Sequence, residues 1–341
     1  MAVNCNNPRG EQLSTNHKGV PGSIILGLAA VIAVGLITAL AVLMQEPEES
    51  KTHIKAAGKN AATSREIVRL PEELTAEFQY RRGWWVANGP ADDNALKRLT
   101  EKQKDISRVL MNQAVVSAKG LELLQGHELH SLDITDCELN IGMAKSISQM
   151  SGLKELLLKD PKATDEVMKA FTGPNSVQSL VLKNSPVTAA GLQQLSSVYP
   201  ELRVLSFINC KGINDLVVPI LINCHKLQSL NLDTTSVTED GAIQLVTHLP
   251  IANLLFEKHG QVDELVEHLN DTKITSLSLS GNALNEKVLA RLSKIKQLKS
   301  LNLTQCPGLT NKRLSVLKKN LPDCQIHLRE IEHFPELELV K

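Results

Sequence analysis

The chain has 341 residues, with 37 basic and 37 acidic side chains and a formal net charge of zero. A chain without net charge has no global field that would attract nucleic acid or an anionic membrane surface. Hydrophobic residues make up 42% of the chain but aromatic residues only 3%. This composition favours an aliphatic core and argues against nucleic-acid binding by base stacking.

An apolar segment lies near the N-terminus. Residues 23–44 read SIILGLAAVIAVGLITALAVLM, without a charged residue. As a helix the segment would span roughly 33 Å, enough to cross a hydrocarbon core of about 30 Å. We therefore expect a short tail over 1–22 and a transmembrane helix over 23–44. A cleaved signal peptide is the alternative, because Ala39-Leu40-Ala41 has the small-x-small form of a cleavage site.

The flanking charges indicate which side of the membrane each part occupies. Arg9 and Lys18 precede the apolar segment, and the acidic run EPEE follows it directly. Basic residues are retained on the cytoplasmic side, and long domains are exported largely regardless of charge. We expect a single-pass protein of the cell membrane with a cytoplasmic N-terminus and an extracytoplasmic C-terminal part. The small-xxx-small pair Gly35/Ala39 would let two such helices pack closely, which allows a homo-oligomer.

The next two segments differ in composition. Residues 45–70 are charged and poor in large apolar groups, which is typical of a flexible stalk. Residues 71–105 are expected to cap the open end of a repeat core. An exposed aromatic recognition patch is the other interpretation of their bulky side chains. These are Leu74, Phe78, Tyr80, Trp84, Trp85 and Val86.

An internal repeat covers residues 106–328. The strand template L-x-x-L-x-L occurs nine times, from Ile106 to Leu303, at intervals of 23–25 residues. A weaker strand with Ile326 and Leu328 closes the array, and 329–341 form a C-terminal tail. Alternate residues of a strand point to opposite faces, so the fourth and sixth template positions should both enter the core.

Each strand is followed by a bend and a helix. The ninth template position holds a small polar or thiol side chain that can bond backbone groups inside the bend. It is Cys137, Cys210, Cys306, Asn282, Thr235 or Ser185, and the cysteines are expected to be buried there. A Thr or Asn suited to N-capping then starts the helix. These residues are Thr188, Asn214, Thr238, Asn285 and Thr310.

These units resemble the leucine-rich repeat of the ribonuclease-inhibitor-like and cysteine-containing class. The segments that carry the resemblance are LRVLSFINCKGINDLVVPILINCHK, LQSLNLDTTSVTEDGAIQLVTHLP and LKSLNLTQCPGLTNKRLSVLKKNLPDCQI. The resemblance implies an α/β solenoid, or horseshoe, with a parallel β-sheet on the concave face and helices on the convex face. With its N-terminal anchor, the chain resembles bacterial single-pass leucine-rich-repeat proteins. The units are shorter than the ribonuclease-inhibitor type, and His259 and Pro161 occupy the usual Cys/Asn position.

Motifs that carry chemistry are not found. The sequence has no His-Glu-x-x-His pair, Cys-x-x-Cys pair, P-loop, G-x-G-x-x-G or G-x-S-x-G. The closest approach to a metal-ligand pair is His127 with His130, which fits loop residues better. We therefore expect a protein without catalytic activity, metal or cofactor.

The expected working surface is the concave sheet, on which the fifth and seventh template positions form rows. Lys159 and Lys183 are neighbours in one row, and Asp233 and Glu257 follow two to three units later. A partner with complementary charges could be steered and aligned there. The alternative is that these are ordinary solvated strand residues. The candidate partner-binding residues are Lys159, Lys183, Asp233, Glu257, Leu157, Val181 and Leu255.

Two functions fit these features. The first is a membrane-tethered module that binds a protein partner, not nucleic acid, through its concave face. The second is a structural spacer of the cell envelope that self-associates through its transmembrane helix.

Overall fold

The computed structural model describes residues 77–159, 163–173 and 175–328, all of which belong to the compact unit Glu66–Lys341. The expected transmembrane helix, 23–44, lies outside the described residues, as do the segments 1–22, 45–70 and 329–341. Within the described ranges, no helix combines the length and the apolar character needed to cross a bilayer.

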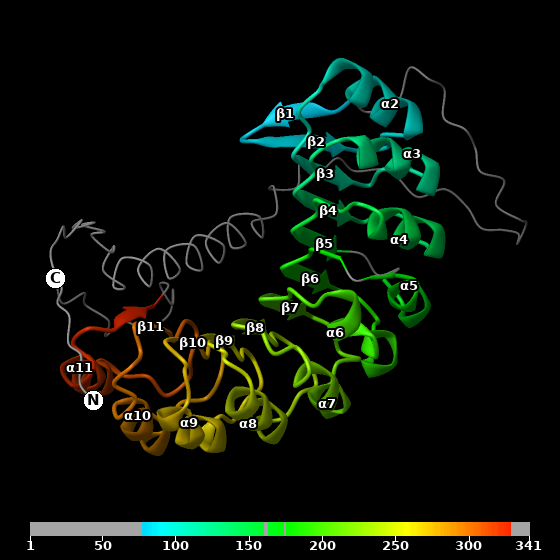
Figure 1. Cartoon of the computed structure of the whole chain (residues 1–341). Coiled ribbons are helices and arrows are strands. Elements are labelled where there is room, and N and C mark those ends of the chain that lie inside the picture. Colours follow the sequence, from blue (N-terminus) through cyan, green and yellow to red (C-terminus); the bar gives the residue numbers. More distant parts are fainter. Residues whose placement is uncertain (1–76, 160–162, 174, 329–341) are drawn as a thin grey trace, which may run out of the picture. The chain divides into compact units, whose positions relative to one another are not determined.

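The strands follow one another in a single sheet whose spatial order is the order of the chain (Figure 1). β1 is antiparallel to β2, and every later neighbour pair is parallel. The strands are β1 Gln79–Arg81, β2 Trp84–Asn88, β3 Arg108–Asn112, β4 Ser131–Thr135, β5 Glu155–Lys159, β6 Ser179–Lys183, β7 Val204–Ile208, β8 Ser229–Asn231, β9 Asn253–Leu255, β10 Ser276–Ser278, β11 Ser300–Asn302 and β12 Gln325–His327.

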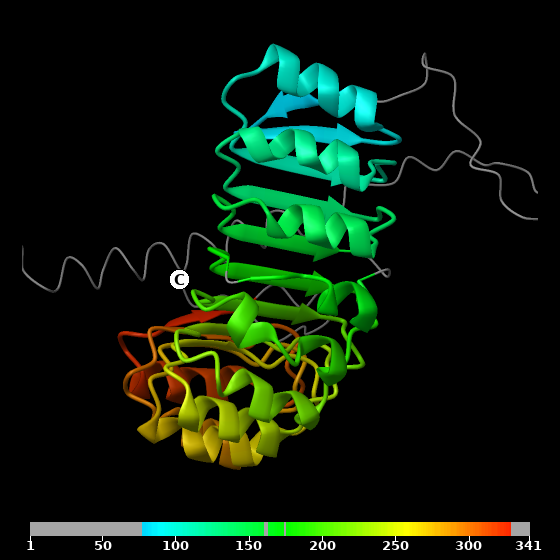
Figure 2. The same cartoon turned by 45° about the vertical axis from the view of Figure 1, so that its right-hand side comes forward.

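One helix or helical turn follows almost every strand and packs on the same side of the sheet. Figure 1 shows the strands on the inner side of the curve and the helices on the outer side, and Figure 2 shows the cyan-to-green helices lying over one face of the strands. The α-helices are α2 Asp93–Lys102, α3 Ala118–Glu122, α4 Ile141–Ser148, α5 Asp165–Lys169, α6 Leu195–Val198, α7 Val218–Leu221, α8 Glu239–His248, α9 Asp263–His268, α10 Glu286–Leu292 and α11 Asn311–Asn320. Short 3₁₀ segments are η2 Leu123–Gly126, η3 Ala189–Leu192, η4 Asp215–Val217 and η5 Leu269–Asp271.

The core lies between the sheet and the helices and has the predicted register. Leucines at the fourth template position pair directly across neighbouring strands, and each has 0% of its surface exposed. This buried row is Leu132, Leu156, Leu180, Leu205 and Leu230. A unit of about two dozen residues cannot bury its own apolar side, so stacking of neighbours supplies the core. The predicted α/β solenoid is confirmed in these units.

The helix starts also follow the sequence prediction. Thr238 Oγ1 accepts a hydrogen bond from the backbone N–H of Gly241, and Asn285 Oδ1 accepts one from Val288. Thr188, Asn214 and Thr310 cap their helices in the same way. Because each cap satisfies an N–H that has no partner within the helix, even the short 3₁₀ segments η3 and η4 have a defined start.

The thiol at the ninth template position bonds a backbone carbonyl group of its own bend, as predicted, and a second carbonyl group in the preceding unit, which was not predicted. Cys210 Sγ lies 3.4 Å from the carbonyl oxygen of Leu182, and Cys306 Sγ lies 3.1 Å from that of Leu279, in each case one unit back in the array. Asn282 Nδ2 donates to Phe256 in the same manner at 2.6 Å. The thiols of Cys210 and Cys306 are buried and form no disulfide bond. Burial raises the pKa of Cys210 to about 11. They act as small donors within the core.

His259 fills the ninth position by a different geometry. Its ring stacks on Phe256 with centroids 3.7 Å apart and an angle of 8° between the planes. Its Nε2 lies 2.8 Å from the carbonyl oxygen of Leu232, the same bond across one unit that the cysteines make. The departure from the repeat pattern therefore preserves the function of the position.

The segment expected as a cap contributes a strand–helix unit of its own. β2 pairs in parallel with β3, and α2 follows it, so this unit precedes the first predicted strand at Ile106. Its template is hard to recognise because Trp85 and Ala87 replace the usual leucines. The antiparallel β1 then covers β2 through a two-residue turn in which Arg82 and Gly83 have φ of 50° and 86°. Two positive φ values define the turn that matches hairpin twist.

Candidate interaction face

The candidate surface is the sheet face opposite to the helices, called the concave face. It is built from the third, fifth and seventh template positions, because side chains alternate along each strand. Strand pairing places the fifth positions in one continuous row, as the sequence predicted. That row is Asp133, Leu157, Val181, Ser206, Asn231, Leu255, Ser278 and Asn302.

The apolar candidates in this row are less accessible than expected. Leu157 has 4% of its surface exposed and Val181 has 1%, whereas Leu255 is half-buried. Leu157 and Val181 stand in the predicted row but expose little side-chain surface for contact. Leu255 is the apolar candidate that retains accessible surface.

The two lysine candidates differ in their surroundings. Lys159 Nζ lies 2.7 Å from Oδ2 of Asp133, whose side chain is 0% exposed. Thr135 donates a further hydrogen bond to the other carboxylate oxygen of Asp133 at 2.9 Å. The charge of Lys159 is thus compensated within the protein. Lys183 on β6 is half-buried and forms no ion pair among the described residues. It is the lysine of the pair that remains available to a partner.

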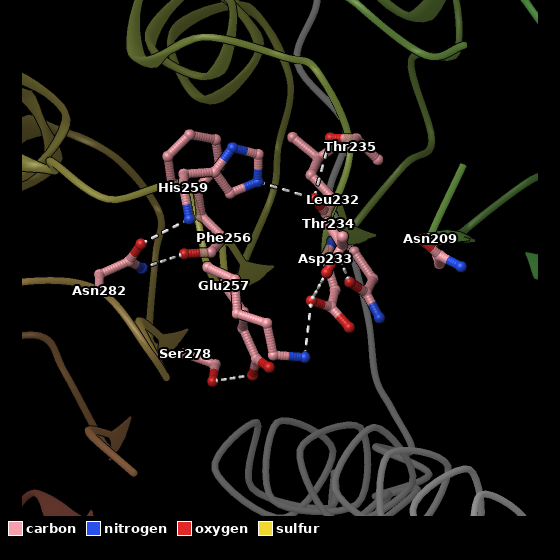
Figure 3. A network of polar contacts seen from close by, with 12 residues as sticks. Asn209, Leu232, Asp233, Thr234, Thr235, Phe256, Glu257, His259, Ser278 and Asn282 are labelled. Atoms are coloured by element: carbon pink, nitrogen blue, oxygen red, sulfur yellow. Dashed lines mark hydrogen bonds and ion pairs between the residues drawn. The ribbon is translucent and has the colours of Figure 1, made fainter. Parts of the chain in front are cut away.

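The acidic candidates lie together at the ends of neighbouring strands (Figure 3). Asp233 Oδ1 accepts a hydrogen bond from Thr234 Oγ1 at 2.7 Å and lies 3.4 Å from Lys258 Nζ. Glu257 accepts a hydrogen bond from the hydroxyl of Ser278. Burial raises the pKa of Glu257 above its ordinary value, and the negative charge of Asp233 adds to this rise. The bond from Ser278 and the charge of Lys258 oppose it.

Small polar side chains extend this acidic region toward β11, and the sequence prediction gave them no role. Asn302 Nδ2 donates to Ser278 Oγ at 2.9 Å, so Ser278 links Asn302 to Glu257. Asn231 Oδ1 accepts a hydrogen bond from the backbone N–H of Asp233 at 2.8 Å. On the other side of Asn231, the buried hydroxyl of Ser206 has no hydrogen-bond partner among the described residues. The signal in the sequence is that Ser or Asn occupies the fifth position in four of the five units from Ser206 to Asn302, with Leu255 as the exception.

Lys258 is a further functional candidate that the sequence did not indicate. It occupies the eighth template position with φ of 60°, which brings its side chain back to Asp233 of the preceding unit. Its side chain is 54% exposed, so its ammonium group is open to solvent on this face. Within the described residues, no cluster of three or more His, Cys, Asp or Glu side chains is arranged to hold a metal ion. The face offers charges and hydrogen bonds for recognition.

Three solved structures are similar to this chain to different degrees. Rad7, solved in complex with Elc1 from yeast, is similar with a TM-score of 0.53 and 15% identity, over 75% of this chain and 73% of that chain. A leucine-rich-repeat protein of Leptospira interrogans has a TM-score of 0.39 and 20% identity, over 67% of this chain and 62% of its own. Internalin C2 of Listeria monocytogenes has a TM-score of 0.34 and 17% identity, over 70% and 92%. No family model matches the sequence. The strand register together with the Rad7 likeness defines a leucine-rich-repeat-like solenoid.

Proposed function

We propose that the chain is a non-catalytic module that binds a protein partner through its concave face, anchored to the cell membrane by residues 23–44. The observation that carries the proposal is the register of the sheet, which aligns the third, fifth and seventh side chains of successive units on a face without helices. Such an extended, regular surface suits a macromolecular ligand. Rad7 was solved in complex with another protein, and we propose that this chain also binds a protein partner.

The charges on this face give the partner an orientation. One strand, β7, lies between Lys183 on β6 and the acidic region of Asp233 and Glu257, which begins at the end of β8. A partner with an acidic group opposite Lys183 and a basic group opposite Glu257 fits in one direction only. Burial of Glu257 adds a cost to leaving its charge unpaired, so a cationic partner group is favoured at that end.

Position-specific crosslinking of the full chain in its native membrane tests the proposal. A photoreactive amino acid replaces Lys183 or Lys258 on the concave face, and Lys287, exposed on α10, serves as the matched control. We expect an adduct with a second protein from the concave positions and none from Lys287. Adducts from Lys287 alone, or equal adducts from all three sites, would contradict the concave-face proposal.

The membrane anchor has its own test. After alkaline extraction, the full chain should stay in the membrane fraction, and a variant without residues 23–44 should be released. Protease added to intact cells should digest the repeats if they are extracytoplasmic. A concave-face adduct that contains only this chain, and is lost in Gly35→Leu, would instead favour the self-associating spacer.

A further inference from the structure

The two tryptophans of β2 lie on opposite faces of the sheet, because side chains alternate along a strand. Trp85 packs against the core, and Tyr80, its partner in the β1–β2 pairing, contacts it with ring centroids 5.1 Å apart. Trp84 directly precedes Trp85 on β2, so it points to the opposite face. The pair of Trp85 and Tyr80 covers the end of the core, and Trp84 is left on the concave face.

Trp84 lies between two arginines. Arg81 is its partner in the β1–β2 pairing. Arg108 lies at the same level on β3, because the next residues, Trp85 and Val109, are register partners. The guanidinium carbon of Arg108 is 5.7 Å from the centre of the Trp84 ring, a cation–π arrangement. Arg81, Trp84 and Arg108 therefore form one row across three neighbouring strands, here called the Trp84 row.

The charges of the Trp84 row are not compensated. Arg81 and Arg108 are exposed, and neither forms an ion pair with any residue that the structure describes. Continuing the row, β4 contributes Ser131 and β5 contributes Glu155, which accepts a hydrogen bond from Ser131 Oγ at 2.6 Å. The positive stretch is therefore confined to β1–β3 and is followed by a carboxylate.

We propose that the Trp84 row is a binding site for a short acidic segment of a partner protein. One carboxylate of the segment pairs with Arg108 and another with Arg81, while an apolar side chain lies on the Trp84 ring. The inference rests on the proposed function, since it assigns one part of the partner interface. Trp and Arg are the side chains most enriched among residues that dominate binding energy, and planar guanidinium groups suit bidentate carboxylate pairing.

The short length of the Trp84 row favours a peptide as its ligand over a nucleic-acid strand. Neighbouring strands are about 4.8 Å apart, so two arginines on either side of one strand are roughly 10 Å apart. Two carboxylates of an extended peptide span such a distance. A phosphate backbone continuing along the face would meet Glu155, and single strands are held by several stacking rings in a basic groove. The row supplies one ring and a short positive stretch.

Tryptophan fluorescence of the full chain in detergent micelles gives a direct test. The chain has two tryptophans, so Trp85→Phe leaves Trp84 as the only tryptophan, which is excited selectively at the red edge of its absorption. The probes are the peptide GEELEEG, its uncharged counterpart GQQLQQG and a short oligothymidylate. We expect the acidic peptide alone to shift the Trp84 emission. Anisotropy of the labelled peptides with the unchanged chain measures the same affinities without relying on the Trp85 variant.

Variants of the row identify the contacts. Arg108→Gln and Arg81→Gln should each weaken acidic-peptide binding about tenfold, and Trp84→Leu should weaken it similarly. Lys102→Gln, which removes one exposed charge from α2 of the same unit, should leave it unchanged. No binding of GEELEEG at millimolar concentration, equal binding of GQQLQQG, or stronger binding of oligothymidylate would overturn the inference. Concave-face adducts from Lys183 that persist in that case would leave the proposed function standing.

Discussion

The eighth residue of the repeat adopts a left-handed backbone conformation in unit after unit. At the eighth position, the described non-glycine residues with this conformation are Gln113, Asp136, Asn184, Asn209, Thr234, Lys258 and Gln305. Asn, Asp and Gly occupy this region at low cost, whereas a β-branched side chain is strained there. Thr234, with φ of 53°, is the β-branched member of the series.

Replacing Thr234 by Asn should therefore stabilise the protein. The change relieves strain of about 1 kcal/mol, and the Asn side-chain amide can donate to Asp233 in place of the part-buried hydrogen bond from the Thr234 hydroxyl. The free energy of unfolding measured in urea should rise by that amount. The reverse change at an equivalent site, Asn209→Thr at φ of 52°, should lower it by a similar amount. A stabilising Asn209→Thr would contradict the explanation.

Two titrating groups near β9 link stability to pH in opposite directions. Burial lowers the pKa of His259 below 6.5, against its bonds to backbone carbonyl groups. Below about pH 6.5 the unfolded chain thus binds a proton that the folded chain binds less readily, and stability falls as pH falls. Glu257 has a raised pKa, so its contribution is present below 4.5 and is lost as pH rises through its folded pKa.

We expect His259→Asn to reduce the loss of stability between pH 6.5 and pH 5, since Asn282 shows that an amide fits the ninth position. Urea midpoints across this range measure the effect. Glu257→Gln is the paired variant, and it should remove the loss of stability as pH rises above 4.5. An unchanged acid slope in His259→Asn would show that other groups control it.

Neighbouring helices are joined by a repeated hydrogen-bonding contact. The N-cap residue of one helix donates to a carboxylate at the start of the preceding helix. Asp215 at the start of η4 accepts the backbone N–H of Thr238 at 2.8 Å and its hydroxyl at 2.7 Å. A Cβ on Gly241 would lie 2.3 Å from the same carboxylate. The contact therefore requires glycine three residues after the cap. The other examples are Asp93 with Ser117 and Gly120, and Asp165 with Thr188 and Gly191.

Gly241→Ala should consequently destabilise the protein although Ala favours helices. Displacing the Asp215 carboxylate from its two donors is expected to cost about 2 kcal/mol. In a double-mutant cycle, Asp215→Ala combined with Gly241→Ala should cost less than the sum of the single changes. Gly126→Ala, where a Cβ would meet no atom within 4 Å, is the matched control. Additive effects would rule out the coupling.

The sequence alone predicted the structural features that arise within a single repeat unit. The fourth and sixth positions, the caps at Thr188 and Thr238, and the donors at Cys210 and Cys306 all follow from one template read repeatedly. The polar contacts between neighbouring helices were not predicted, because they depend on how far one helix start lies from the next. The same limit applies to the candidate site: the position of Lys159 was predicted, but its diagonal pairing with Asp133 was not.

For the whole array, stability depends on contacts between adjacent units. Each strand pairs only with the strands before and after it in the chain. In such an array, a defect in the centre disturbs neighbours on both sides, whereas a defect at an end disturbs one. Phe207 on β7 is 0% exposed near the middle, and Ile326 on the terminal β12 is half-buried.

Phe207→Ala is expected to cost about 3–5 kcal/mol, and Ile326→Ala about 1 kcal/mol. Hydrogen exchange of the full chain should show lost protection on β6 and β8 as well as β7 in the first variant. In the second, the loss should be confined to β11 and β12. Lost protection across the entire array in Ile326→Ala would mean that the units unfold as one block.

The reversed direction of β1 also limits how such a chain can lengthen during evolution. A duplicated internal unit brings a strand that finds parallel neighbours on both sides, as every strand from β3 to β11 does. A copy added ahead of Gln79 would meet an antiparallel strand of three residues instead of another unit. New repeats can therefore be accommodated between β2 and β12, and the hairpin fixes the first position of the series.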